Sequence, residues 1–172
     1  MSPRSLLCLA VLPLAGPGAA QTPDAQAPEM QRPLASAQAD GVVHTLRQIP
    51  EACTRLEGVF TGEAGNPYRY SAVRTSEHCQ PRARLVDFDK AAPTEAKGWN
   101  LNDVIRVPSA ACPSQQAVMR IWRLPVQQAP KLDGQGQARI YLEEARQQAA
   151  AGAMPTVPLY AAKLTLEGKA CR

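Results

Sequence analysis

The chain has 172 residues and a formal net charge of +4 at pH 7, with 45% hydrophobic, 20% charged and 5% aromatic residues. This length is typical of one globular domain. The composition excludes a collagen, a coiled coil, a polytopic membrane protein and a highly charged disordered chain. The net charge is too small to indicate nucleic-acid binding.

The first twenty residues have the three parts of a secretory signal peptide. Arg4 precedes the apolar run Leu6–Leu14, and small residues at Gly18 and Ala20 prepare a cleavage site before Gln21. The run is shorter than the roughly 20 apolar residues that span a bilayer, so we expect no membrane span. The alternative, a buried first helix, is disfavoured by the prolines and glycines in this segment. We therefore predict a bacterial protein that is periplasmic or secreted.

The segment Gln21–Asp40 contains three prolines, many Ala and Gln residues, and no apolar periodicity. Such a segment has too little apolar surface to offset the entropy of ordering it. We expect residues 21–40 to form a flexible leader and residues 41–172 to form a single globular domain.

Export would leave four cysteines, namely Cys53, Cys79, Cys112 and Cys171. An even number of cysteines in an oxidising compartment predicts two disulfides. Four cysteines allow three connectivities, and the expected strand pairing favours one of them.

Strand-like segments at 53–63 and 69–79 flank a cluster of turn-forming residues at 64–67. Antiparallel pairing of these two segments brings Cys53 opposite Cys79. We therefore predict a β-hairpin that is closed by a Cys53–Cys79 disulfide.

The charge pattern favours this register. It sets Arg55 opposite Glu77 and Glu63 opposite Arg69, and opposite charges across a hairpin stabilise it. The inward face then collects the following residues: Leu56, Gly58, Phe60, Gly62, Tyr68, Tyr70 and Ala72. The two glycines leave room for the neighbouring aromatic rings, so this face is the expected core face.

The segments Ala117–Leu124 and Leu159–Glu167 are the next predicted pair of strands. Laid antiparallel, they bring the remaining two cysteines together at one end. Strict pairing also sets Arg120 opposite Lys163, and this like-charge contact costs stability. We therefore expect a bulge or a non-adjacent placement here.

Shorter apolar runs predict further strands at Val42–Ile49, Arg84–Phe88 and Val104–Val107. Residues 137–151 instead carry an apolar stripe with helical periodicity. The expected fold is a small antiparallel α+β domain of about six or seven strands, with one amphipathic helix before the last strand. An all-β sandwich is the alternative.

The sequence offers little for catalysis. His44 and His78 are its two histidines, and neither lies in a nucleophile motif. Asp87 and Asp89 form a weak carboxylate pair at a strand end, where acidic residues usually face solvent. No metal-binding motif or phosphate-binding glycine loop occurs, so we expect no metal and no cofactor.

Two features of the sequence are typical of surfaces that bind a partner. Trp99 lies in the polar loop Lys90–Asn100 and either anchors a partner or folds back over the core. Strand arginines are the second feature, and they either form a patch for anionic polymers or are scattered over the surface. The binding candidates among them are Arg69, Arg74, Arg84, Arg106 and Arg120, and Arg82 and Arg123 belong to the same set.

These patterns favour a non-catalytic binding module whose partner is another envelope or secreted protein, of the inhibitor, immunity or assembly-accessory type. A small envelope hydrolase using His78, Asp87 or Asp89 is one alternative. A binder of anionic envelope polymer through the arginines is the other. The sequence specifies no oligomeric state.

Overall fold

The structure is a computed structural model that describes residues 26–126, 143, 146–147, 150–152 and 156–171. The predicted signal peptide lies outside the described residues. So do the residues that carry the apolar stripe of the predicted helix at 137–151. For the described helices, none is long and apolar enough to cross a membrane.

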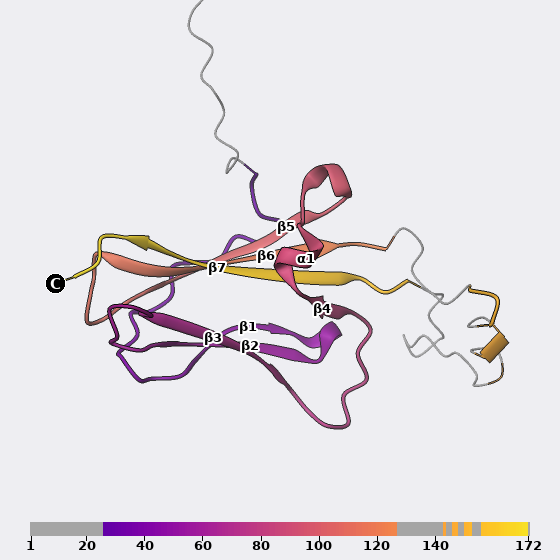
Figure 1. Cartoon of the computed structure of the whole chain (residues 1–172), viewed down its shortest axis with the longest axis horizontal. Helices are drawn as coiled ribbons and strands as arrows, with labels where there is room; N and C mark the ends of the chain where they lie inside the picture. The colour runs from indigo at the N-terminus through magenta and orange to yellow at the C-terminus, as the bar shows by residue number, and fades with distance from the viewer. Residues whose placement is uncertain (1–25, 127–142, 144–145, 148–149, 153–155, 172) are drawn as a thin grey trace, which may run out of the picture.

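The described residues form a small α+β domain that consists mostly of strands (Figure 1). Its elements are β1 (His44–Ile49), η1 (Pro50–Ala52), β2 (Thr54–Phe60), β3 (Tyr68–Arg74), β4 (Arg84–Val86), α1 (Phe88–Ala91), η2 (Glu95–Lys97), β5 (Asn100–Pro108), β6 (Gln115–Leu124) and β7 (Leu159–Gly168). The strands form one sheet with the order β1-β2-β3 and a second with the order β4-β7-β6-β5. Figure 1 shows these sheets as two facing layers, so the seven expected strands are divided between two sheets.

The first disulfide forms as predicted, but the predicted hairpin register is wrong. Cys53 bonds to Cys79 with a Cα–Cα distance of 5.8 Å. The ladder instead pairs Thr54 with Arg74 and Phe60 with Tyr68, so the two predicted cross-strand ion pairs do not form. The reason is that β3 ends at Arg74, and a turn then carries the second cysteine back to the first.

Arg74 stabilises this turn. Its guanidinium donates to the carbonyl oxygens of Ser76, Glu77 and Cys79 at 2.9–3.2 Å. The shift from the predicted register is an even number of residues, so each strand keeps the predicted side chains on each face. Leu56, Phe60 and Tyr68 are buried, as expected, whereas Tyr70 and Ala72 are exposed.

In the second pair of strands the expected bulge or non-adjacent placement is wrong, and the strict antiparallel pairing forms instead. β6 and β7 are adjacent and antiparallel, Arg120 lies opposite Lys163, and Cys112 bonds to Cys171. The two cations avoid each other because they turn to different partners. Arg120 donates to Glu167 at 2.8 Å, and the Lys163 ammonium lies 5.0 Å from the centre of the Phe88 ring.

β4 departs from the all-antiparallel expectation. It pairs parallel with the start of β7, from Arg84 opposite Leu159 to Val86 opposite Ala161. The chain then forms α1, whose first turn is capped by the Asp87 carboxylate accepting from the Lys90 N–H at 2.9 Å.

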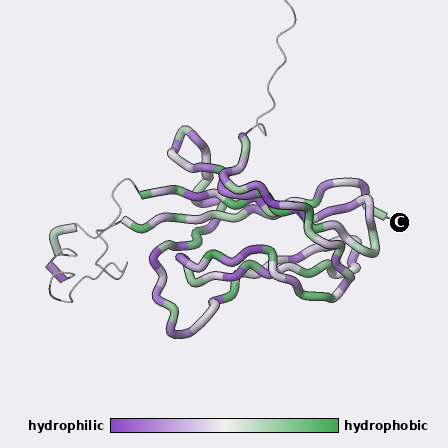
Figure 2. The backbone as a smooth tube through the Cα atoms, turned by 180° about the vertical axis from the view of Figure 1, so that it is seen from behind, coloured by the Kyte–Doolittle hydropathy of each residue, from purple (hydrophilic) through white to green (hydrophobic). Residues whose placement is uncertain are grey.

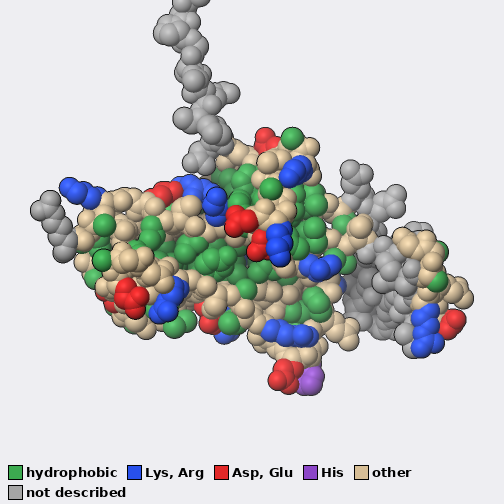
Figure 3. Space-filling model, in the orientation of Figure 1, with side chains coloured by type: hydrophobic (Ala, Val, Ile, Leu, Met, Phe, Trp, Pro, Cys, Tyr) green, Lys and Arg blue, Asp and Glu red, His purple; other side chains and the backbone are tan. Residues whose placement is uncertain are grey.

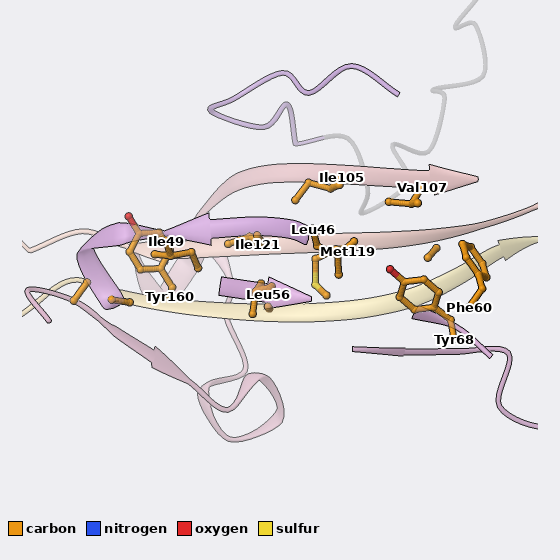
Figure 4. Packing of buried hydrophobic residues seen from close by; sticks show 14 residues of the cluster. Leu46, Ile49, Leu56, Phe60, Tyr68, Ile105, Val107, Met119, Ile121 and Tyr160 are labelled. Carbon is orange, nitrogen blue, oxygen red and sulfur yellow. The ribbon is translucent and has the colours of Figure 1, made fainter. Parts of the chain in front are cut away.

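The core lies between the two sheets (Figure 4). Figure 2 shows hydrophobic and hydrophilic residues alternating along several strands, which is the pattern of sheets with one buried face. The core residues from β1, β2, β5 and β6 are Leu46, Ile49, Leu56, Phe60, Ile105, Val107, Ala117, Met119 and Ile121. Full burial of one such side chain contributes about 1.5–3 kcal/mol to folding.

Gly58 leaves room for Tyr68, as predicted, since a Cβ there would lie 1.8 Å from the phenol oxygen. Gly62 has a different role, because its φ of 73° lies in the left-handed region that favours glycine.

The leader differs from the expectation over its described part, residues 26–40. Instead of extending freely, it follows β5 in a parallel direction, with bridges from Met30 to Asp103 and from Gln38 to Ser109. Main-chain hydrogen bonds connect it to β5, including Ala35 N–H to Arg106 O at 3.0 Å. The backbone groups of the β5 edge thus compensate for the low apolar content of this segment.

Candidate binding surface

Among the described strands, two edges on one side of the molecule have no partner strand. β4 covers β7 as far as Ala161, and no described strand pairs with this edge of β7 from residue 162 onward. β3 is the outermost strand of the other sheet. We call this side, formed by β3 and residues 162–168, the open side. Unpaired edges present N–H and C=O groups that another chain can bind.

A shallow pocket of about 490 Å³ connects the two edges. Tyr68 and Tyr70 of β3 line it together with Ala162 and Leu164 of β7. Tyr70 is 41% exposed, and Leu166, further along β7, is 37% exposed. Figure 3 shows this side with hydrophobic side chains in a band between the two layers. Exposed apolar surface of this kind often marks an interaction site.

Charged groups surround the apolar part of the open side. Arg69, Lys163 and Asp89 also line the pocket. Burial and, after it, the negative charges of Asp87 and Asp89 raise the pKa of the Tyr70 hydroxyl above its ordinary value of 10. This phenol is therefore a neutral hydrogen-bond donor and acceptor at physiological pH.

The opposite side of the molecule is closed. There the leader covers β5, and the fully buried carboxylate of Asp103 lies between two arginines. Arg47 of β1 approaches its Oδ2 atom at 2.9 Å, and Arg32 of the leader approaches the same atom at 3.1 Å. This cluster connects both sheets and the leader.

A second ion pair holds the beginning of the described leader. Arg123 of β6 donates to both carboxylate oxygens of Glu29 at 2.6 and 3.1 Å, and Asn100 and Asn102 donate to them as well. Hydrogen bonding from Arg123 is the largest cause that lowers the pKa of Glu29 to about 2, and burial opposes it. Among the described strands, the free edge of the four-stranded sheet is therefore at β4 and the later part of β7, and not at β5.

Trp99, the aromatic candidate for partner binding, is 4% exposed. It folds back into the protein, which is the alternative that the sequence left open. A side chain so deeply buried does not contact a partner in this conformation.

The five candidate arginines do not form one patch. Arg69 lies on the open side, Arg74 stabilises the disulfide turn, and Arg84 is exposed on β4. Arg106 and Arg120 line a different pocket of about 260 Å³, together with Arg32 of the leader. Arg120 is paired with Glu167 and Arg32 with Asp103, so two of these three cations already have carboxylate partners.

The catalytic candidates have structural contacts or are exposed. His44 Nε2 lies 2.8 Å from the Tyr68 hydroxyl, and its Nδ1 lies 3.1 Å from the Val42 carbonyl oxygen. Asp87 caps α1, and both His78 and Asp89 are exposed. Within the described part of the chain, no group of three His, Cys, Asp or Glu residues is placed to hold a metal ion.

Comparison with protein-family models, with curated proteins and with solved structures finds no match to the chain. The open side is therefore identified from the geometry of this structure alone. The sequence does not mark Leu164 and Leu166 as site residues, because an alternating strand does not reveal where its neighbour ends. The available signal was the shortness of the apolar run at β4 relative to that of β7.

Proposed function

We propose that this protein is a non-catalytic binding module of the periplasm or the secreted space, and that it binds an extended segment of another envelope or secreted protein along its open side. Two disulfides fit a protein that folds outside the reducing cytoplasm. The observation that carries the proposal is the pair of unpaired strand edges with exposed apolar side chains between them.

This surface suits recognition by strand addition. Main-chain groups of the edge supply affinity, and pockets for alternate side chains supply specificity. Tyr70 offers an apolar ring and a hydroxyl, while Arg69, Lys163 and Asp89 offer charges around it. The two disulfides and the closed side at β5 keep the surface rigid, which lowers the entropy cost of binding.

Site-specific photo-cross-linking in cells that export the protein tests this proposal. A benzophenone amino acid replaces Tyr70 on the open side, and a matched variant carries it at Thr45, an exposed residue of β1 in the same sheet. We expect Tyr70 to yield an adduct with a different polypeptide that Thr45 does not give. Equal adducts at both positions, or none at Tyr70, would reject the open side as the surface that binds a different polypeptide.

One observation supports a second candidate, the binding of anionic envelope polymer. The pocket lined by Arg32, Arg106 and Arg120 collects three guanidinium groups, and no described carboxylate pairs with Arg106. Binding of dextran sulfate should then fall steeply with salt and weaken in Arg106→Gln. Binding that is independent of salt, or unchanged in this variant, rejects the candidate.

A further inference from the structure

We propose that a second copy of this chain pairs with the open side through residues 163–167 of β7. This inference rests on the proposed function, because it takes the open side to be a surface that accepts a strand, and it names one such strand. The two copies would lie antiparallel about a two-fold axis at Thr165 and form one continuous eight-stranded sheet.

The main-chain N–H and C=O groups of β7 point in the directions that such pairing needs. The Arg84 N–H donates to the Pro158 carbonyl oxygen at 3.0 Å, so residue 158 directs its carbonyl toward the β4 side. Alternate residues of a strand direct their N–H and C=O groups to the same side. Leu164 and Leu166 therefore present these groups at the free edge, where β4 has already ended.

The side chains of this segment are complementary to themselves. Its sequence is Lys-Leu-Thr-Leu-Glu, from Lys163 to Glu167. With Thr165 on the axis, Lys163 of one copy lies opposite Glu167 of the other, and Leu164 lies opposite Leu166. Opposite charges and apolar residues in directly opposed positions stabilise antiparallel strands.

The two faces of the strand agree with this arrangement. Leu164 packs against the hydrophobic core from the inner face, and the 37% exposed Leu166 follows it on the same face. Lys163 and Glu167 share the outer face with Thr165, which accepts from Arg120 at 3.0 Å. Pairing thus covers the exposed leucine and places each charge beside an opposite charge.

Sedimentation equilibrium of the purified protein with charge-reversal variants tests the inference. Lys163→Glu places two glutamates opposite each other, and Glu167→Lys places two lysines opposite each other. We expect the wild type to dimerise, and each variant to raise the dimer dissociation constant about tenfold. An equimolar mixture of the two variants should form heterodimers, because both cross-strand pairs then become attractive.

The heterodimer distinguishes pairing from unfolding, since a variant that is merely misfolded is not rescued by another variant. Oxidation of Thr165→Cys supplies a second, register-specific readout. We expect a covalent dimer from this variant and none from Lys163→Cys, which does not lie opposite itself.

A wild type that stays monomeric up to about 1 mM, or a mixture that gives no heterodimer, would overturn the inference. The proposed function stands in that case if Tyr70 still cross-links to a different polypeptide. A dimer without such a cross-link would instead support the inference and reject the proposed partner.

Discussion

The Nε atom of Arg47 on β1 lies 2.9 Å from the Oδ2 atom of Asp103 on β5, so one ion pair joins the two sheets. The carboxylate is fully buried, and the arginine side chain is 21% exposed. Arg32 of the leader approaches the same oxygen, which makes the leader part of the folded domain. On the closed side of the molecule, one buried acid thus contacts both sheets and the leader.

Asp103→Asn should lower the free energy of unfolding by about 3 kcal/mol, because it leaves two partly buried arginines without their buried anion. Urea unfolding measures this loss. Glu57→Gln is the matched control, since it breaks the more exposed Arg55–Glu57 pair and should cost less than about 1 kcal/mol. Equal losses in the two variants would contradict a special role for Asp103.

The ion pair of Glu29 with Arg123 predicts a dependence of stability on pH. The pKa of Glu29 falls from 4.5 to about 2 on folding, so its stabilising contribution is present above pH 4.5 and is lost as the pH falls to about 2. Solvent reaches this pair, so we expect Glu29→Gln to cost about 1 kcal/mol at pH 7. The difference from wild type in urea unfolding should vanish near pH 2. A difference that stays constant down to pH 2 would refute this assignment, and Glu63→Gln in the exposed β2–β3 turn serves as control.

Gly58→Ala should destabilise the three-stranded sheet by about 2–3 kcal/mol. Its new Cβ would lie 1.8 Å from the hydroxyl oxygen of Tyr68 and 2.6 Å from the carbon that carries it, so the buried ring must move. Gly65→Ala is the matched control, because nothing lies within 4 Å of a Cβ there. Thermal unfolding compares the stability of the two variants. A loss of stability in Gly58→Ala that is no greater than in Gly65→Ala would show that the Tyr68 ring moves aside without destabilising the protein.

Trp99→Ala should affect stability and not partner selection. Truncation of a buried tryptophan costs about 3–5 kcal/mol, whereas Trp99→Phe fills most of the space and should cost less. We expect Trp99→Phe to keep the cross-link from position 70. A folded Trp99→Phe that loses this cross-link would mean that Trp99 takes part in binding.

Local patterns predicted the strands well. All seven predicted strands are present, and both disulfides have the predicted partners. The cysteines at one end of β6 and β7 indicate their strict antiparallel pairing, whereas the like charges of Arg120 and Lys163 predict a bulge that the structure lacks. The strands and the disulfide partners depend on periodicity and spacing, which can be read directly from a sequence.

Predictions failed where a non-local contact competes with a local one. The charges of Arg55 and Glu63 suggested a register that the turn after Arg74 replaces. The leader lacks an apolar stripe but binds to β5 through main-chain hydrogen bonds. The amino-acid composition does not reveal such bonds, because every residue type except proline carries both main-chain groups. The open side depends on where β4 stops beside β7, which is a property of the assembled sheet.

Amide hydrogen exchange at single-residue resolution tests the open side most directly. The protein is measured alone at low concentration and then with the polypeptide that cross-links to position 70. We expect the amides of Leu164 and Leu166 to exchange freely in the protein alone and to become protected in the complex. Protection that appears elsewhere, with these two amides still exchanging freely, would contradict this expectation.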